Sequence, residues 1–257
     1  MLPARCPSAS RFRPSMAALG SAPHPAWVID LGRLEYGAAL EWQRRVHEAV
    51  RDGKWPDTLL LVEHDPVFTV GRHARGSHAN VLWSDDERRR HGVALFDVDR
   101  GGDATYHGPG QQVGYPILHL DRHSEDLLVY LRDLEQAFIN LLADEGLAAG
   151  RIPPHTGVWV GDEKLVAIGV KASQRVTSHG FAFNVDPNLG HFAGIIPCGI
   201  QDKGVTSLVR LTGRPTTLAA MRPAVLHHLG TVLGCAWDAL SADVVRARLA
   251  EPLAARP

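Results

Sequence analysis

The sequence predicts a single α/β domain in which helices pack against one mixed sheet. Predicted strands outnumber predicted helices, and the two kinds do not alternate regularly along the chain. No internal repeat and no interdomain linker interrupts the 257 residues, a length that suits one domain or at most two. We therefore expect one domain over residues 26–240, with a tail over 1–25 before it and a short helix and tail over 241–257 after it.

The composition is that of an ordinary globular protein. Hydrophobic residues make up 45% of the chain, and the net charge of −1 argues against a nucleic-acid-binding domain, which would usually be basic. No apolar run approaches the roughly 20 residues of a membrane-spanning helix. Cys6, Cys198 and Cys235 are too few and too scattered for a disulfide framework, so we expect a reducing, cytoplasmic compartment.

The 14 histidines are dispersed, and neither a His-Glu-x-x-His motif nor a Cys-x-x-Cys pair occurs. Those spacings are the usual signatures of zinc, so we expect no metal.

The first 25 residues are rich in Pro, Ser, Ala and Arg, and no acidic residue precedes Asp30. This composition is typical of a disordered tail. It is similar to that of a transit peptide, but the segment lacks an amphipathic pattern and the apolar core of a signal peptide. Met16 is an equally acceptable first residue.

The first elements of the domain are well marked. A strand is expected at 26–31, and apolar residues then recur at helical spacing over 34–51, where Asp52-Gly53 ends the helix. Residues 58–63, Thr-Leu-Leu-Leu-Val-Glu, form a continuous apolar run that is typical of a buried strand. Extended structure resumes at 67–70.

The middle of the chain predicts two strands and a long helix. The strands are expected at 93–98 and 113–120. Ser124 is a suitable N-cap for the helix, which carries a strong apolar stripe and is ended by Gly146.

The last part of the domain predicts a hairpin over 157–173 and a further strand over 180–185. Helical patterning returns at 217–233, where Pro223 either kinks the helix or marks its first turn. A short final helix is expected at 241–249.

Residues 100–116 are the densest glycine segment of the chain, beginning Arg-Gly-Gly-Asp-Ala-Thr-Tyr-His-Gly-Pro-Gly. Glycines allow a backbone to bend sharply and to approach a ligand closely. The segment lacks the Gly-Lys-Ser/Thr of a nucleotide loop, and a strand follows it where such a loop would begin a helix. We expect either a loop that wraps an elongated ligand against the sheet or a purely structural turn.

Two basic clusters lie in the first half of the chain. One contains Arg72 and Arg75, and the other is the run Arg88, Arg89 and Arg90. Each is either an ordinary solvated surface or a landing patch for an acidic partner.

Cys198 and Lys164 are the residues best suited to chemistry. Cys198 stands between Pro197 and Gly199, in a segment that cannot be a regular helix or a central strand. A cysteine attacks as the thiolate, and a nearby cation favours that form.

Lys164 begins a predicted strand, so strand alternation places it on the same apolar face as Val166, Ile168 and Val170. Partial burial at the rim of such a face lowers the pKa of a lysine and suits it to carrying protons. The functional interpretation is a Cys–Lys dyad assembled by folding. The alternative is a lysine that reaches solvent from a strand end and a cysteine that is simply buried.

Several co-linear motifs resemble one family. They are Glu-His-Asp-Pro-Val followed by Gly71-Arg72, the Arg100-Gly-Gly-Asp-Ala-Thr-Tyr-His-Gly-Pro-Gly-Gln run, Lys164-Leu-Val-Ala-Ile-Gly, His179-Gly-Phe-Ala-Phe-Asn-Val and Ile196-Pro-Cys-Gly-Ile. Together they resemble the lipoyl(octanoyl) transferases, over residues 26 to 240 and in the family's order.

The resemblance implies the catalytic fold of biotin and lipoate protein ligases. It further implies transfer of an octanoyl group from acyl carrier protein to a lysine of a lipoyl domain, through an acyl-cysteine thioester and without ATP, another cofactor or a metal. The implied acceptors are the lipoyl domains of 2-oxoacid dehydrogenase E2 subunits and the H protein of glycine cleavage; no nucleic acid or membrane is involved.

Site residues follow from the same resemblance. Cys198 would be the nucleophile, and Lys164 would lower the pKa of its thiol and transfer protons. The substrate site would be lined by Arg100, Gly101, Gly102, Asp103, Ala104, Thr105, Tyr106, His107, Ala167, Ile168, Gly169, Gly180, Phe181 and Ala182.

Three other functions remain open at this point. An ATP-dependent lipoate or biotin ligase of the same fold would need no cysteine. A hydrolase would use Cys198 with His107 or His179 and would release free octanoate. A non-enzymatic module that binds acyl carrier protein would keep its function without Cys198.

Overall fold

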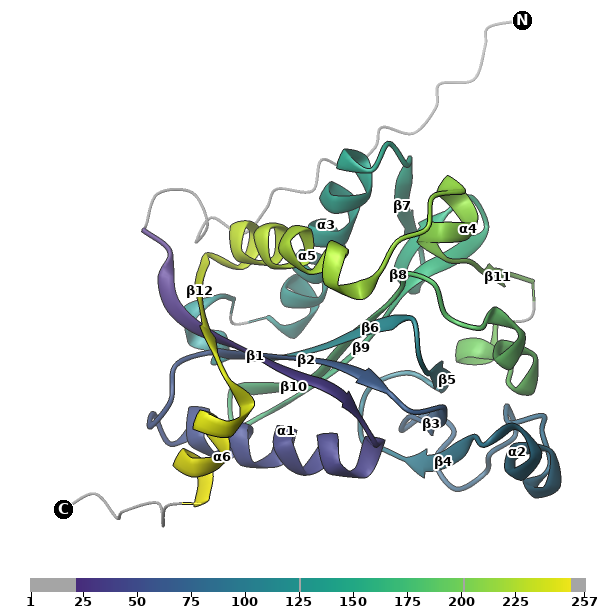
Figure 1. Cartoon of the computed structure of the whole chain (residues 1–257), viewed down its shortest axis with the longest axis horizontal. Coiled ribbons are helices and arrows are strands. Elements are labelled where there is room, and N and C mark those ends of the chain that lie inside the picture. Colours follow the sequence, from purple (N-terminus) through teal and green to yellow (C-terminus); the bar gives the residue numbers. More distant parts are fainter. Residues whose placement is uncertain (1–21, 125, 201, 251–257) are drawn as a thin grey trace, which may run out of the picture.

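The computed structural model describes residues 22–124, 126–200 and 202–250. Within these ranges, nine strands form one mixed sheet, the middle layer of the molecule (Figure 1). From edge to edge they are β12 (Cys235–Leu240), β1 (His24–Leu34), β2 (Thr58–His64), β6 (Gln111–Ile117), β10 (Val176–Asn184), β9 (Glu163–Ser173), β8 (His155–Val160) and β7 (Ala149–Ile152), with β11 (Gly204–Val205) beside β9. Parallel and antiparallel pairs both occur, which confirms the predicted mixed sheet.

Helices cover both faces of this sheet (Figure 1). On one face α1 (Tyr36–Arg51) packs across β2, β6 and β10, and α6 (Ala242–Ala250) contacts β1. On the other face α3 (Leu127–Asp144) packs against α5 (Leu218–Leu233). Among the described helices, none is long and apolar enough to span a membrane.

The continuous apolar run of β2 is explained by these two layers. Leu59 and Leu61 belong to the core under α3 and α5, whereas Leu60 and Val62 belong to the core under α1. Successive side chains of a strand point to opposite faces, and here both faces are covered. The run therefore predicted the strand correctly.

A second, three-stranded sheet flanks the main one. Its strands are β4 (Ala94–Asp97), β3 (Val67–Val70) and β5 (Ala104–His107), and α2 (Asp85–His91) lies near it (Figure 1). The glycine-rich segment is therefore not one long loop, because it contributes β5 and the start of β6. The shorter helical segments are η2 (Leu120–Arg122), η3 (Leu189–Gly194), η4 (Pro197–Gly199) and α4 (Leu208–Thr212).

Some predicted boundaries are wrong. The N-cap of α3 is Asp126, whose carboxylate accepts a hydrogen bond from the N–H of Leu128 at 2.7 Å, and not Ser124. By contrast, the helix predicted over 217–233 is confirmed as α5 with Thr217 as its N-cap, and Pro223 lies inside the helix and not in its first turn. Strand β12 was not predicted because its sequence, Cys-Ala-Trp-Asp-Ala-Leu, contains no β-branched residue.

The predicted tail lies outside the described residues as far as residue 21, and β1 already begins at His24.

Candidate active site

Lys164 is the second residue of β9, and only 5% of its surface is exposed to solvent. Its Nζ lies 4.7 Å from the centre of the Trp159 ring, a cation–π contact. Gly157, on the neighbouring strand, leaves room for the lysine stem, since a Cβ there would come within 3.5 Å of Cδ and Cε. Lys164 is thus buried more deeply than the rim position that the sequence predicts.

Cys198 occupies the single turn η4, Pro197–Gly199. This short 3-10 turn agrees with the expectation that the segment is neither a regular helix nor a central strand. The turn ends at Gly199, whose φ of 69° lies in the left-handed region that favours glycine. The side chain of Cys198 is outside the part of the chain that the structure describes.

The chain after this turn returns to Lys164. β11 pairs in parallel with the start of β9, so that Val205 lies beside Lys164. The N–H of Thr206 donates to the carbonyl oxygen of Lys164 at 3.1 Å. Lys164 and Pro197, the residue before Cys198, also line one small cavity. The fold thereby brings the lysine and the cysteine-bearing turn to the same space.

Asn80 holds this turn against the glycine-rich segment, and the sequence analysis missed it. Its carbonyl oxygen accepts from the N–H of Ile196 at 2.8 Å, and its side-chain amide donates to Asp103 Oδ2 at 2.5 Å. Gly199 packs on this pair, since a Cβ there would lie 3.4–3.5 Å from both side chains. No local sequence signal marks Asn80, because its partners are remote in the chain.

A narrow slot lies between the glycine-rich segment and the two central strands β9 and β10. Eleven of the predicted substrate residues line it: Arg100, Gly101, Gly102, Thr105, His107, Ala167, Ile168, Gly169, Gly180, Phe181 and Ala182. The slot shares Thr105 and Ala167 with the small cavity beside Lys164. The two spaces are therefore adjacent, and the lysine and the cysteine-bearing turn lie on the side of the small cavity.

Three predicted substrate residues lie elsewhere. Ala104 and Tyr106 are buried in a separate core on the far face of β5, while Thr105 and His107 face the slot. This division follows from the two-residue period of a strand. Asp103 holds Asn80, as described above.

Four further residues line the slot that were not among the predicted substrate residues: Tyr36, Val113, Tyr115 and His179, the last of which was named only for the hydrolase alternative.

Close backbone packing forms the walls of the slot. The N–H of Gly101 donates to the carbonyl oxygen of Val170 at 3.1 Å, which docks the glycine-rich segment on β9. A Cβ on Gly169 would lie 3.1 Å from the carbonyl oxygen of Gly101 and 3.2 Å from Cδ of Arg100. The Arg100 guanidinium is itself fixed, because it donates to the carbonyl and hydroxyl oxygens of Thr69 at 2.7 and 2.9 Å.

A chain of hydrogen bonds joins the slot to the neighbourhood of Lys164. His107 Nδ1 donates to Gln111 Oε1 at 2.7 Å, and Gln111 Nε2 donates to Asn184 Oδ1 at 2.9 Å. Asn184 Nδ2 in turn donates to the carbonyl oxygen of Thr206 at 3.0 Å, next to the backbone of Lys164. The amide oxygen of Gln111 can only accept a hydrogen bond, so Nδ1 of His107 is the donor and carries the proton.

Two buried histidines of this region are neutral at pH 7. Burial lowers the pKa of His107 to about 3 and that of His64 to about 4. His64 hydrogen-bonds the Tyr115 hydroxyl at 2.7 Å and the carbonyl oxygen of Leu34 at 3.0 Å. Among the described residues that line the cavity shared by Lys164 and Pro197, none is a histidine.

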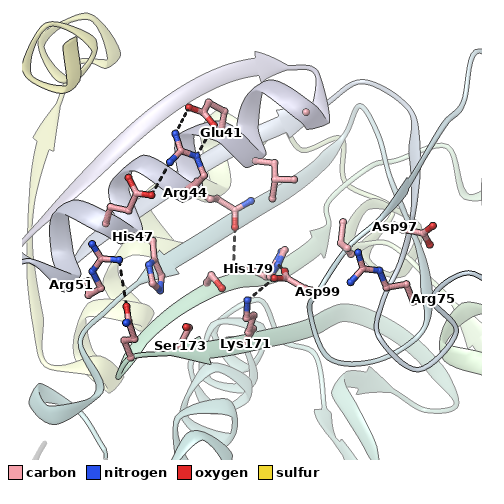
Figure 2. Close-up of a pocket in the computed structure, with 17 residues that line it drawn as sticks. Glu41, Arg44, His47, Arg51, Arg75, Asp97, Asp99, Lys171, Ser173 and His179 are labelled. Carbon is pink, nitrogen blue, oxygen red and sulfur yellow. Dashed lines mark hydrogen bonds and ion pairs between the residues drawn. The ribbon is translucent and has the colours of Figure 1, made fainter. Parts of the chain in front are cut away.

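A wider groove adjoins the slot, and the two share His179 (Figure 2). His179 Nε2 lies 2.7 Å from Asp99 Oδ1, and Lys171 donates to Asp99 Oδ2 at 2.5 Å. These contacts, the one from His179 above all, lower the pKa of the Asp99 carboxyl. Lys171 therefore faces the groove and Lys164 the cavity, as strand alternation predicts for lysines seven residues apart.

The two basic clusters differ. In α2, Arg88 and Arg89 form ion pairs with Asp85 and Asp86 of the same helix, so this segment carries its own neutralising acids. Arg72 and Arg75 are exposed, and Arg75 lines the wide groove (Figure 2).

Solved structures of other proteins share this architecture. A protein from Thermoplasma acidophilum, described as a putative lipoate protein ligase with bound lipoic acid, superposes with a TM-score of 0.71 at 16% identity, covering 88% of this chain and 93% of that one. A lipoate-protein ligase A bound with ATP superposes with a TM-score of 0.69 at 16% identity, covering 89% and 95%. The fold is therefore that of the lipoate protein ligase catalytic domains.

Sequence relatives define the family more narrowly. The family described as "Lipoyl protein ligase A/B catalytic domain" matches residues 35–230. An octanoyltransferase of Caldicellulosiruptor saccharolyticus is 46% identical over 218 residues, which cover 84% of this chain and 92% of that protein. The chain belongs to the lipoyl protein ligase A/B catalytic-domain family and, within it, to the octanoyltransferases.

Proposed function

We propose that the chain moves an octanoyl group from the thioester of acyl carrier protein to a lysine amine of a lipoyl domain, with Cys198 as the acyl carrier between them. One observation supports the site above all others. Lys164 and the turn that bears Cys198 line one small cavity, and this cavity adjoins a slot lined by most of the predicted substrate residues.

The first half-reaction acylates the enzyme. The Cys198 thiol passes its proton to Nζ of Lys164, and the thiolate attacks the carbonyl carbon of the octanoyl thioester. The bond to the phosphopantetheine sulfur breaks, and that sulfur takes the proton from Lys164. One thioester is exchanged for another, so the step is nearly balanced in free energy and needs no nucleotide.

The second half-reaction reverses the proton transfers. The neutral lysine amine of the acceptor attacks the octanoyl carbonyl, and the amine gives its surplus proton to Lys164. The Cys198 sulfur leaves and is protonated again by Lys164. An amide is more stable than a thioester, so this step proceeds downhill.

The slot suits an extended saturated chain. Gly101, Gly102, Gly169 and Ala167 leave room in it, Ile168 and Phe181 add apolar surface, and larger polar side chains such as Arg100 and His107 line it as well. Burying an eight-carbon chain contributes about 5 kcal/mol at ~0.8 kcal/mol per CH₂ before the cost of binding. The hydrocarbon would lie in the slot, with the carbonyl carbon toward Lys164.

The proposed partners follow from this reaction. Acyl carrier protein is the donor, and the exposed Arg72 and Arg75 suit its acidic surface. Lipoyl domains are the acceptors, among them those of 2-oxoacid dehydrogenase E2 subunits and the glycine cleavage H protein. We expect these encounters in the cytoplasm.

Intact-protein mass spectrometry tests this function directly. The enzyme is mixed with octanoyl-acyl carrier protein without ATP, beside Cys198→Ala. We expect one octanoyl adduct on the wild type alone, cleared when apo lipoyl domain is added and recovered as octanoyl-lipoyl domain. Transfer by Cys198→Ala would show that another residue is the nucleophile, and release of free octanoate would indicate a hydrolase.

An ATP-dependent ligase is the alternative function that one observation favours. The fold is shared with a lipoate-protein ligase A bound with ATP. That likeness, at 16% identity, shows the fold alone. Octanoate-dependent ATP–pyrophosphate exchange, with no adduct from the carrier-protein thioester, would favour that alternative.

A further inference from the structure

A second cluster of reactive side chains lies at the β12–β1 edge of the main sheet, away from β9 and β11 (Figure 1). His24 begins β1, Cys235 begins β12, and His123 follows η2. One ligand atom of each, two imidazole nitrogens and the thiol sulfur, lies within 4.8 Å of the other two. The reaction proposed above uses none of them.

Asp57 adds a fourth ligand atom to this cluster. Its Oδ2 lies 3.0 Å from His24 Nε2 and 2.7 Å from His123 Nε2. Sγ of Cys235 lies 3.5 Å from the same His24 nitrogen. The carboxylate is fully buried, while 28% of the His24 side chain is exposed and leaves a route from solvent.

The contacts around His123 call for a positive charge in this cluster. Its Nδ1 faces the carbonyl oxygen of Leu233 at 2.9 Å, and its Nε2 faces the carboxylate of Asp57. Both partners are acceptors, and a neutral imidazole has only one N–H. With Nδ1 donating to Leu233, Nε2 is placed to offer its lone pair to a cation held together with Asp57.

The surrounding contacts are those that orient metal ligands. Ligating histidines usually donate their other N–H to a carbonyl or carboxylate, as Nδ1 of His123 does to Leu233. Ligating carboxylates are themselves hydrogen-bonded. Asp57 Oδ1 accepts from Arg122 at 2.8 Å and from the N–H of His119 at 2.9 Å, which leaves Oδ2 toward the histidines.

We propose that His24, Asp57, His123 and Cys235 form a structural zinc site. Zinc–nitrogen bonds of about 2.0–2.1 Å and zinc–sulfur bonds of about 2.3 Å place tetrahedral ligand atoms roughly 3.3–3.8 Å apart. The 3.5 Å between Cys235 Sγ and His24 Nε2 lies in that range, whereas the 3.0 and 2.7 Å between Asp57 Oδ2 and the two histidine nitrogens would lengthen when the metal binds.

Two imidazoles, a thiolate and a carboxylate suit zinc better than magnesium or calcium, which prefer oxygen ligands. Binding releases the thiol proton to solvent, and no electron is transferred. Four protein ligands close the coordination sphere, so the site is structural and not catalytic. The site joins four segments: the start of β1 through His24, the start of β12 through Cys235, the residue before β2 through Asp57, and the residue after η2 through His123. The zinc would thus fasten the edge strand β12 to the sheet.

The test uses the full chain with any affinity tag removed, because tags bind metal. A Cys6→Ser/Cys198→Ser double variant retains Cys235 as its only thiol. Metal is stripped by dialysis, one equivalent of cobalt(II) is added, and the absorption spectrum is recorded. We expect a thiolate-to-cobalt charge-transfer band and the intense visible bands of four-coordinate cobalt, both abolished by zinc. The same protein loaded with zinc should retain one metal per chain by elemental mass spectrometry after gel filtration.

Variants separate the ligands from their support. His123→Ala should lose the retained zinc, whereas Arg122→Gln should keep the stoichiometry and weaken affinity roughly 10- to 100-fold. A double variant that is folded by circular dichroism yet shows no charge-transfer band and retains no zinc would overturn the proposal. Retention that is unchanged in His123→Ala would do the same. Both readouts are independent of octanoyl transfer.

Discussion

Val205 lies beside Lys164 in a short parallel pairing, and this contact ties the cysteine-bearing turn to the start of β9. Two backbone hydrogen bonds hold it: Gly204 N–H donates to the carbonyl oxygen of Asp162 and Thr206 N–H to that of Lys164, each at 3.1 Å. Backbone bonds of this kind do not depend on side-chain rotamers. The proposed dyad is therefore positioned by secondary structure on the lysine side, and its chemistry can be tested by substitutions that leave this pairing intact.

Lys164→Ala should slow acylation of Cys198 by about 10²- to 10⁴-fold, the usual contribution of a positioned proton carrier. The thiolate would also lose its neighbouring cation, so alkylation of Cys198 by iodoacetamide should shift to higher pH. Single-turnover acylation and the pH profile of alkylation measure the two effects.

The matched control for that experiment is Lys171→Ala, on the same strand but paired with Asp99 in the groove. It should leave the alkylation profile of Cys198 unchanged. If Lys164→Ala gave the wild-type profile as well, the proton-carrier role of Lys164 would be wrong.

Reversing the charge of Arg72 and Arg75 to Glu should weaken binding of the acidic carrier protein. The loss should be several-fold at low salt and should shrink as ionic strength rises, because exposed charges are screened over about 8–10 Å. Binding titrations at two salt concentrations measure it. Arg214→Glu, whose side chain is paired with Glu145, serves as a control that should have little effect. Equal binding by all three proteins would rule out this landing patch.

Gly169→Ala should narrow the slot. Its Cβ would press on the carbonyl oxygen of Gly101 and on Arg100 at 3.1–3.2 Å, and such overpacking typically costs ~1–3 kcal/mol. We expect kcat/KM for the octanoyl donor to fall about tenfold, which corresponds to ~1.4 kcal/mol, and that for a butanoyl donor to fall less. Gly150→Ala is the control, because a Cβ at that position meets no atom within 4 Å. A uniform loss for both chain lengths would contradict a role of Gly169 in shaping the slot.

The free energy of unfolding should decrease as pH falls below 6.5. His64 and His107 have pKa values of about 4 and about 3 in the folded protein, below the ordinary 6.5, so the unfolded chain binds protons first. Stability from each is fully present above pH 6.5 and is lost as pH falls toward the folded-state pKa, by up to about 1.4 kcal/mol per pH unit.

Urea unfolding at pH 7 and at pH 5.5 measures this change. In His107→Asn the difference between the two pH values should be smaller than in the wild type. An identical difference would mean that His107 is not held neutral by burial.

Sequence alone determined the elements with a strong local signal. The apolar run of β2 and the helical spacing of α1 each depend on neighbouring residues and on burial, so their patterns were sufficient. The sequence also predicted that the segment around Cys198 is neither a regular helix nor a central strand, because Pro197 fixes its own φ and lacks an N–H while Gly199 permits a left-handed φ. The ordered motifs also indicated the family that the comparisons confirm.

Only the tertiary structure decided which residues meet. Asn80 supports the cysteine-bearing turn from more than a hundred residues away, and Ala104 and Tyr106 turn from the slot because β5 pairs with β3. His24, Asp57, His123 and Cys235 share no spacing motif, since four separate segments bring them together. Local sequence patterns reveal the period of a strand or a helix. Which elements then pair depends on packing energies summed over the whole core, and these cannot be read from neighbouring residues.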